Sequence, residues 1–84
     1  MGMQTGNTTK LTNKAIRAWT YRGGWDVRWD QAVTGLGLRI YPSGKKSFVL
    51  SYRARGSKRL MVLGNFGADL TLDQARTRAR KHLV

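Results

Sequence analysis

The residues of this chain that could do chemistry are mostly cationic. Seven Lys and Arg side chains, and no acidic one, fall between positions 39 and 59. They are Arg39, Lys45, Lys46, Arg53, Arg55, Lys58 and Arg59. Lys and Arg held together on one surface neutralise phosphate groups and release their condensed counterions. The chemistry that this segment favours is therefore the binding of a polyanion, nucleic acid first of all.

The chain contains few residues of the types that act in catalysis. The chain holds one His, four Asp, no Glu and no Cys, which excludes a thiol nucleophile, a thiolate zinc site and disulfides. Asp26 and Asp30 could form a carboxylate pair, but Arg22 and Arg28 flank them, which favours charge neutralisation and turn hydrogen bonds. His82 has no second metal ligand one helical turn away. We expect no catalytic residue, no metal site and no cofactor.

Length and composition favour one small domain. The chain has 84 residues, a net charge of +12 and 40% hydrophobic residues, which predicts a packed core despite the charge. Residues 1–10 hold little that could be buried and are predicted to form a disordered tail, so the domain should span residues 11–84. No apolar run fits a membrane span or a signal peptide. We expect a cytoplasmic protein without a small-molecule substrate.

Three short segments are predicted to be strands: the first two alternate apolar and polar residues, whereas the third is apolar from 60 to 63 and is expected to turn Met61 and Leu63 toward the core. They span residues 36–41, 47–55 and 58–63, and turns containing glycine separate them. A fourth segment, 25–30, alternates as well and could add a short strand at the edge. The sequence therefore predicts a small three-stranded antiparallel sheet, with this edge strand as an option.

Helices are predicted before and after the sheet. Thr12 can cap a short helix that contains Ile16. Further along, Thr71 and Gln74 fit a capping box, and a helix should run from Leu72 to the end of the chain. The predicted fold class is α+β, with the C-terminal helix packed on one face of the sheet and the other face left free.

The free face of the predicted sheet should carry much of the basic segment. Alternation sends Arg39, Arg53 and Arg55 away from the apolar face. A ribbon of two or three antiparallel strands fits the major groove of B-DNA, where Arg contacts guanine with its planar fork, while cations at turns suit phosphates better. The candidate DNA-binding residues are Arg39, Tyr41, Lys45, Lys46, Ser51, Arg53, Arg55, Lys58 and Arg59.

Other interpretations of the same residues stay open. The cations could be the solvated side of a half-exposed sheet in a non-catalytic protein-interaction domain. A double-stranded-RNA-binding module also combines a three-stranded sheet with helices. Trp25 and Trp29 could close one end of the core. The basic residues of the last helix either extend the binding surface or stabilise the helix dipole; they are Arg76, Arg78, Arg80 and Lys81.

Several blocks of the sequence together resemble a known family. The most specific is GLGLRIYPSGKKSF at positions 35–48, and weaker ones are LTNKAI at 11–16 and LDQAR at 72–76. Shorter matches fall at 29–30, 52–53 and 63–64. In this combination the chain is similar to the amino-terminal arm-type DNA-binding domain of phage and genomic-island integrases, which belong to the tyrosine recombinases.

The resemblance implies a fold, a partner and a role. In that family a three-stranded sheet backed by a C-terminal helix lies in the major groove of arm sites beside the recombination core. The implied partners are double-stranded DNA and the core-binding and catalytic domains of the same integrase, and the implied role is integration of a mobile element such as a prophage. The chain would then be a non-catalytic fragment of a longer integrase, and Tyr21, Tyr41 and Tyr52 would not act as nucleophiles.

Overall fold

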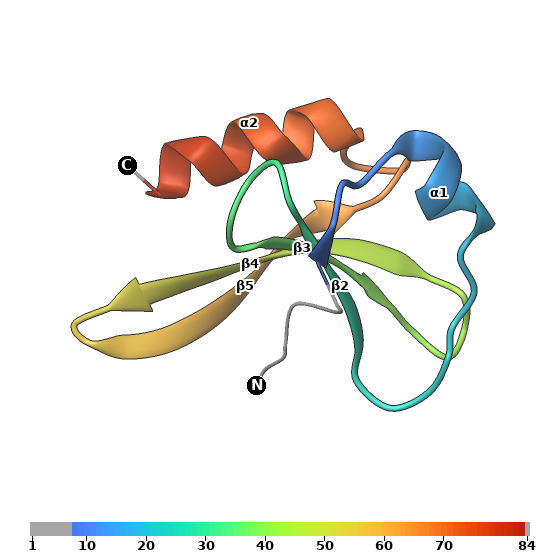
Figure 1. The fold of residues 1–84 in the computed structure, drawn as a ribbon, viewed down its shortest axis with the longest axis horizontal. Coiled ribbons are helices and arrows are strands. Elements are labelled where there is room, and N and C mark those ends of the chain that lie inside the picture. Colours follow the sequence, from blue (N-terminus) through green and yellow to red (C-terminus); the bar gives the residue numbers. More distant parts are fainter. Residues whose placement is uncertain (1–7, 84) are drawn as a thin grey trace.

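A meander of antiparallel strands with one long helix lying along it makes up the fold (Figure 1). The computed structural model describes residues 8–83. In chain order the elements are β1 (Thr8–Thr9), α1 (Asn13–Ala18), β2 (Asp26–Asp30), β3 (Leu36–Ile40), β4 (Lys46–Ala54), β5 (Ser57–Asn65) and α2 (Leu72–Leu83). The strands form one sheet in the order β1-β2-β3-β4-β5, in which the pairs β2–β3, β3–β4 and β4–β5 are antiparallel.

The α+β class and the C-terminal helix are confirmed, but the sheet has four antiparallel strands rather than three. The segment at 25–30 is a full member, because β2 pairs with β3 from Asp26 opposite Ile40 to Trp29 opposite Gly37. The inward side of β2 is charged, since Asp26 and Asp30 alternate to that side and are buried there. The segment alternates as a strand does, but its charged side faces the core and Trp29 faces away from it. It therefore lacks the apolar core side by which the other strands are recognised, and so the sequence predicts it only as an optional edge strand.

The tail predicted over residues 1–10 overlaps the sheet. Thr8 and Thr9 form β1, which runs parallel to β2 opposite Trp29 and Asp30. The Gln31 N–H extends this pairing by donating to the Thr9 carbonyl at 3.0 Å. Residues 1–7 lie outside the described residues. The sheet therefore begins before residue 11, the boundary expected for the domain.

The hydrophobic core lies between the sheet and the two helices. Its centre consists of β3 and β4 side chains that are at most 1% exposed: Leu36, Leu38, Ile40, Phe48 and Leu50. From α2 the residues Leu72, Ala75 and Ala79 cover this cluster, and Ile16 of α1 joins it. Burying a Leu or Phe side chain stabilises a fold by about 1.5–3 kcal/mol. This packing fixes α2 on the face of the sheet that carries these residues.

Both helices begin at the caps that the sequence predicts. The Thr12 hydroxyl accepts a hydrogen bond from the Ala15 N–H at 3.1 Å. At the start of α2, the Thr71 hydroxyl accepts from the Gln74 N–H at 3.3 Å, and the Gln74 side chain accepts from the Thr71 N–H at 2.9 Å. This reciprocal pair is a capping box. It sets the first residue of α2 and thereby the helix face that meets the sheet.

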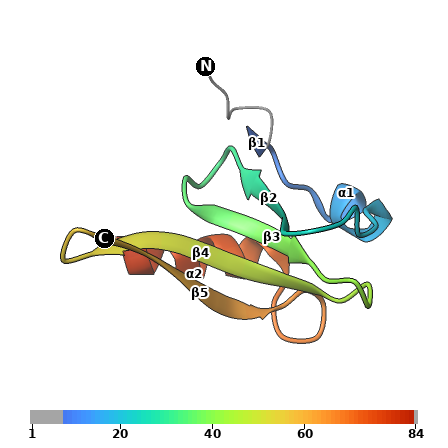
Figure 2. The same cartoon turned by 90° about the horizontal axis from the view of Figure 1, so that it is seen from below.

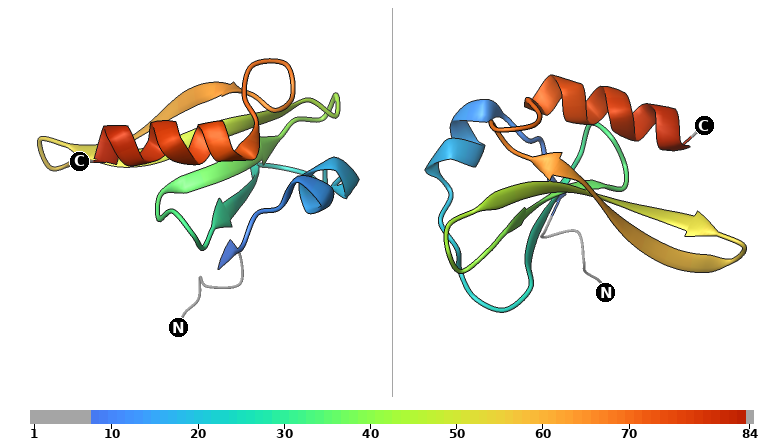
Figure 3. Two further views of the ribbon diagram at one scale, coloured as in Figure 1. Left: turned by 90° about the horizontal axis from the view of Figure 1, so that it is seen from above. Right: turned by 180° about the vertical axis from the view of Figure 1, so that it is seen from behind.

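Among residues 8–83, no helix covers the sheet face away from α2. Seen from below, the strands lie in front of α2 (Figure 2), whereas from above α2 lies in front of the strands (Figure 3, left). The turn of the β4–β5 hairpin projects past the C-terminal end of α2 in both Figure 1 and Figure 3. A partner can therefore reach this sheet face and the hairpin tip without meeting the helix.

Candidate functional site

Cross-strand pairing divides the side chains of the sheet between two faces, because directly opposite residues project to the same side. The core residues Leu38 and Phe48 are one such pair, on the side that α2 covers. We call the opposite side the outer face. Its members are Val27, Trp29, Gly37, Arg39, Ser47, Val49, Ser51, Arg53, Lys58, Leu60, Val62 and Asn65, together with Trp25, which precedes β2 and stacks on Arg39.

The outer face carries positive charge and no carboxylate. Arg53 and Lys58 lie opposite each other near the tip of the β4–β5 hairpin, and both are exposed. Arg39 adds a third cation from β3 and is half-buried. All four aspartates of the chain lie within the described residues, and all are elsewhere: Asp26 and Asp30 on the core side of β2, Asp69 in the loop before α2, and Asp73 in α2. The side chains that project from this face therefore carry a net positive charge, which attracts an anion.

Arg39 is held between two aromatic rings. Its guanidinium carbon lies 4.1 Å from the centre of the Trp25 ring and 4.4 Å from that of the Tyr41 ring. The Lys45 ammonium lies 5.7 Å from the same Tyr41 ring. Cation–π contacts at exposed sites are worth about 0.5–1 kcal/mol each. Because the stack restricts the rotamers of Arg39, this side chain loses less entropy when it binds an anion.

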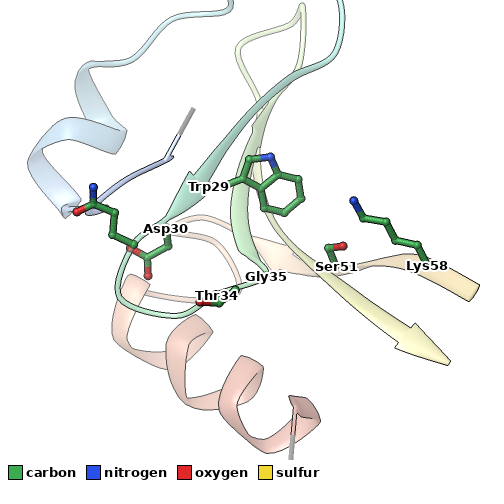
Figure 4. A pocket seen from close by; sticks show the side chains of 7 residues that line it. Trp29, Asp30, Thr34, Gly35, Ser51 and Lys58 are labelled. Carbon is green, nitrogen blue, oxygen red and sulfur yellow. The ribbon is translucent and has the colours of Figure 1, made fainter. Parts of the chain in front are cut away.

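A groove of about 460 Å³ opens on the outer face. Trp29 and Lys58 stand on opposite sides of it, with Ser51 between them (Figure 4). Asp30, whose carboxylate is paired with Arg76, and the following loop close its other end. A smaller hollow of about 270 Å³ shares Trp29, Ser51 and Lys58 and reaches Trp25 and Leu60. The two hollows combine an aromatic wall with a cationic wall, a combination that suits a ligand with both flat and anionic parts.

Trp25 and Trp29 lie on the outer face. The expectation that they close one end of the core is therefore wrong. Trp25 is 60% exposed. The Trp29 ring lies over Gly37, since a Cβ at that position would come within 2.7 Å of the ring. A glycine in the middle of a strand often marks such a close approach. It is the one sequence signal that could have placed Trp29 on this face.

Most of the predicted binding residues gather on or beside the outer face. Arg39, Ser51 and Arg53 occupy it as the alternation of β3 and β4 predicts. Arg55, expected at the end of a strand, lies instead in the two-residue hairpin turn with a φ of 52°, followed by Gly56 with a φ of 79°. Two positive φ values match the right-handed twist of the flanking strands, so the chain turns one residue earlier than predicted.

Two predicted binding residues occupy core-side positions of the sheet. Lys46 lies opposite Ile40, and its ammonium donates to the Arg17 carbonyl at 3.3 Å, close to the end of α1. Arg59 lies opposite Tyr52 on the edge strand β5 and also borders the smaller hollow. The pairing register, which the sequence does not reveal, decides these faces. Lys46 and Arg59 are therefore not members of the outer face.

Asp30 joins three parts of the chain on the core side. Its side chain is fully buried and accepts hydrogen bonds from the Leu11 N–H at 3.1 Å, from the Val33 N–H at 3.3 Å and from Arg76 Nε at 3.0 Å. Arg76 also donates to the Leu11 carbonyl at 2.9 Å. Burial raises the pKa of Asp30, but the Arg76 and backbone hydrogen bonds outweigh it and hold that pKa below 3.8. Arg76 thus has a structural partner within the fold.

Asp26 forms a second buried ion pair on the same side of β2. It lies 3.3 Å from the Arg28 guanidinium, which also stacks on Trp19 at 4.6 Å. The Arg22 N–H donates to the Asp26 carboxylate at 3.0 Å. Burial raises the pKa of Asp26, but the hydrogen bonds from Arg28 and Arg22 lower it to a net value below 3.8. Both aspartates thus neutralise arginines and accept backbone hydrogen bonds. Arg28 is the partner that the sequence indicates for Asp26, whereas Asp30 pairs with the distant Arg76.

Acid should weaken the fold through these two carboxylates. The pKa values of Asp26 and Asp30 are lower in the folded chain than in the unfolded chain, where an Asp has a pKa of about 3.9. The two carboxylates therefore stabilise the fold above that pH, and this stabilisation is lost as the pH falls through their folded pKa values. We expect the urea midpoint to hold between pH 5 and 7 and to fall below about pH 4. An Asp26→Asn variant should show a shallower fall, because it titrates one group fewer. A midpoint that is the same at pH 2 and pH 6 would refute this linkage.

The fold and this site define a class of protein. It is a small α+β domain with a helix on one face of an antiparallel sheet and cationic side chains on the other, and such a cationic surface suits a nucleic-acid partner. A family model described as an arm DNA-binding domain matches residues 11–84. The chain belongs to this family, which confirms the resemblance seen in the sequence. No curated protein matches the chain.

Family membership indicates what the domain does in general terms. Arm DNA-binding domains are non-catalytic, and their part in recombination is to bind DNA. Among residues 8–83, no group of three or more His, Cys, Asp or Glu side chains could hold a metal ion. In the same part of the chain, no helix has the length and apolar character needed to cross a membrane.

Proposed function

We propose that this chain is the arm-type DNA-binding domain of an integrase of the tyrosine recombinase family, and that it binds double-stranded attachment-site DNA through the outer face. The observation that carries the proposal is the charge of that face, where Arg39, Arg53 and Lys58 stand without a carboxylate. Cations in this position release counterions from DNA phosphates. The ribbon of β4 and β5 is a shape that the major groove admits.

The residues divide into two roles. Arg39 and Arg53 are the candidates for base contact, because a guanidinium fork matches the O6 and N7 acceptors of guanine. Tyr41 steadies Arg39 through the stack at 4.4 Å. The remaining candidates contact phosphates or sugars and set the register of the domain on the duplex; they are Lys45, Ser51, Arg55 and Lys58.

In this role the domain works with other parts of a longer integrase. Strand exchange belongs to a catalytic domain, and the recombination core is held by a core-binding domain of the same protein. The arm-type domain contributes affinity for accessory sites at a distance from that core, and tethering raises the effective concentration of the other domains there. The process served is integration of a mobile element such as a prophage.

Replacing Arg53 by Ala tests the binding face. We expect a loss of about 1–3 kcal/mol, or roughly 5- to 150-fold in affinity, on a duplex selected from a random pool, because a base or phosphate contact is removed. Fluorescence anisotropy of the labelled duplex measures it. Arg78→Ala is the matched control, since it removes the same charge from α2 on the covered side of the sheet. Equal losses for the two variants would contradict binding through the outer face.

The same titrations separate the remaining interpretations. A loss confined to the selected duplex assigns Arg53 to base contact, and a uniform loss on all duplexes assigns it to phosphate contact. Competition with an RNA duplex of equal length tests the kind of nucleic acid. If the RNA duplex competes more strongly than the DNA duplex, the chain is better described as a double-stranded-RNA-binding module, and the proposal is contradicted.

A further inference from the structure

Two apolar side chains stand exposed among the cations of the outer face. Leu60 is 43% exposed and Val62 is 57% exposed. Both belong to β5, where Lys58 precedes them on the same side of the strand, opposite Arg53. The order along this side of β5 is therefore one cation followed by two apolar residues.

The fold itself does not use these two side chains. The alternate positions of β5, Met61 and Leu63, turn to the other side and pack against the core. An uncovered Leu or Val gains little of the free energy that burial provides. Val49, which lies opposite Val62, is fully buried on the same face, so Val62 extends an apolar surface that starts inside the sheet. A partner that covers Leu60 and Val62 would bury this surface completely.

The neighbouring charges narrow the choice of partner. Because Arg53 and Lys58 flank the apolar pair and all four carboxylates lie elsewhere, the partner that fits is a polyanion with apolar groups at its surface. In the major groove of duplex DNA, the apolar group within reach of a protein is the 5-methyl group of thymine. Side chains such as Leu and Val are suited to contact that methyl group by packing.

We propose that Leu60 and Val62 contact thymine methyl groups, so that the preferred duplex carries thymines opposite β5. This inference rests on the proposed function. Side chains two residues apart on one strand are about 6.6–6.8 Å apart. Successive base pairs are separated by about 3.4 Å. When β5 follows the groove, the two residues reach thymines two base-pair steps apart.

Deoxyuridine provides the test, because it lacks the 5-methyl group of thymine and keeps the same hydrogen-bonding edge. A duplex is selected from a random pool with the full chain, and its thymines are then replaced by deoxyuridine. Each contacted methyl group should be worth about a fourfold loss of affinity, and two should be worth about fifteenfold. Anisotropy titrations at one fixed salt concentration measure both duplexes.

Two variants link the loss to these residues. Leu60→Ala with Val62→Ala should bind the thymine and deoxyuridine duplexes with equal affinity. Arg53→Ala is the matched control: it weakens binding to both duplexes but keeps the preference for thymine, because it leaves both apolar side chains in place. Since Leu60 and Val62 are exposed, the double variant should keep the melting temperature of the parent within a few degrees, which circular dichroism checks.

The possible results test the thymine contact separately from the proposed DNA binding on which it rests. Equal affinity of the parent chain for both duplexes, with salt-dependent binding intact, overturns the thymine contact and leaves the binding function standing. A full preference for thymine in the double Ala variant also overturns it. Failure to bind any duplex would remove the proposed function and this inference together.

Discussion

Replacing Asp30 by Ala should lower the free energy of unfolding by about 3–5 kcal/mol. The change leaves the Arg76 guanidinium without its carboxylate and the Leu11 and Val33 N–H groups without their acceptor. Each buried polar group left unpaired costs about 1–3 kcal/mol. A domain of this length has roughly 4–12 kcal/mol of stability in total, so much of it would be lost. Urea and thermal unfolding followed by circular dichroism measure the effect.

Two further variants isolate the cause. Asp73→Ala also removes a carboxylate, but from the exposed first turn of α2, and should cost less than about 1 kcal/mol. Asp30→Ala combined with Arg76→Met should cost less than the sum of the single changes, because no unpaired charge remains. A loss below about 1 kcal/mol in Asp30→Ala alone would show that this carboxylate does not tie β2 to α2.

Raising the salt concentration from 50 to 200 mM should weaken duplex binding by a factor on the order of 500. The outer face and its turns bring five cations to the DNA surface, and each displaces about one condensed counterion whether it contacts a base or a phosphate, which predicts a slope of about −4.5 for log affinity against log salt. These cations are Arg39, Lys45, Arg53, Arg55 and Lys58. The loss of affinity is large because it equals the fourfold ratio of the salt concentrations raised to the power of about 4.5.

Anisotropy titrations at four or more salt concentrations give the slope directly. Lys58→Ala should make it shallower by about 0.9, which is one phosphate contact, and Arg78→Ala should leave it unchanged. A slope near zero for the parent chain would mean that phosphates are not neutralised, and the electrostatic basis of the interface would be lost.

The sequence predicted those parts of the fold that depend on interactions between residues close together in the chain. The caps at Thr12 and Thr71 and the alternation of β3 and β4 all depend on residues close in the chain. The role of β2 could not be predicted in the same way. Its buried carboxylate at Asp30 is matched by Arg76, which lies 46 positions away, and only the folded chain brings the two together.

The candidate site was predictable to a similar extent. Alternation was enough to place Arg39 and Arg53 on the outer face. The stack of Trp25 on Arg39 could not be foreseen, because it depends on the pairing of β2 with β3. The faces of Lys46 and Arg59 depend on pairing as well. A shift of one residue in register exchanges the two faces of a strand, and the sequence alone does not exclude such a shift.

In the proposed binding mode, one face of the sheet serves folding and the other serves recognition of DNA. Arg53, Lys58, Leu60 and Val62 are exposed on the outer face, while the packed cluster lies on the other side. Substitutions at these four positions leave that cluster untouched, so sequence drift there can change which DNA is chosen at little risk to the scaffold. For the same reason, these positions are the ones to randomise in a library aimed at new target sites.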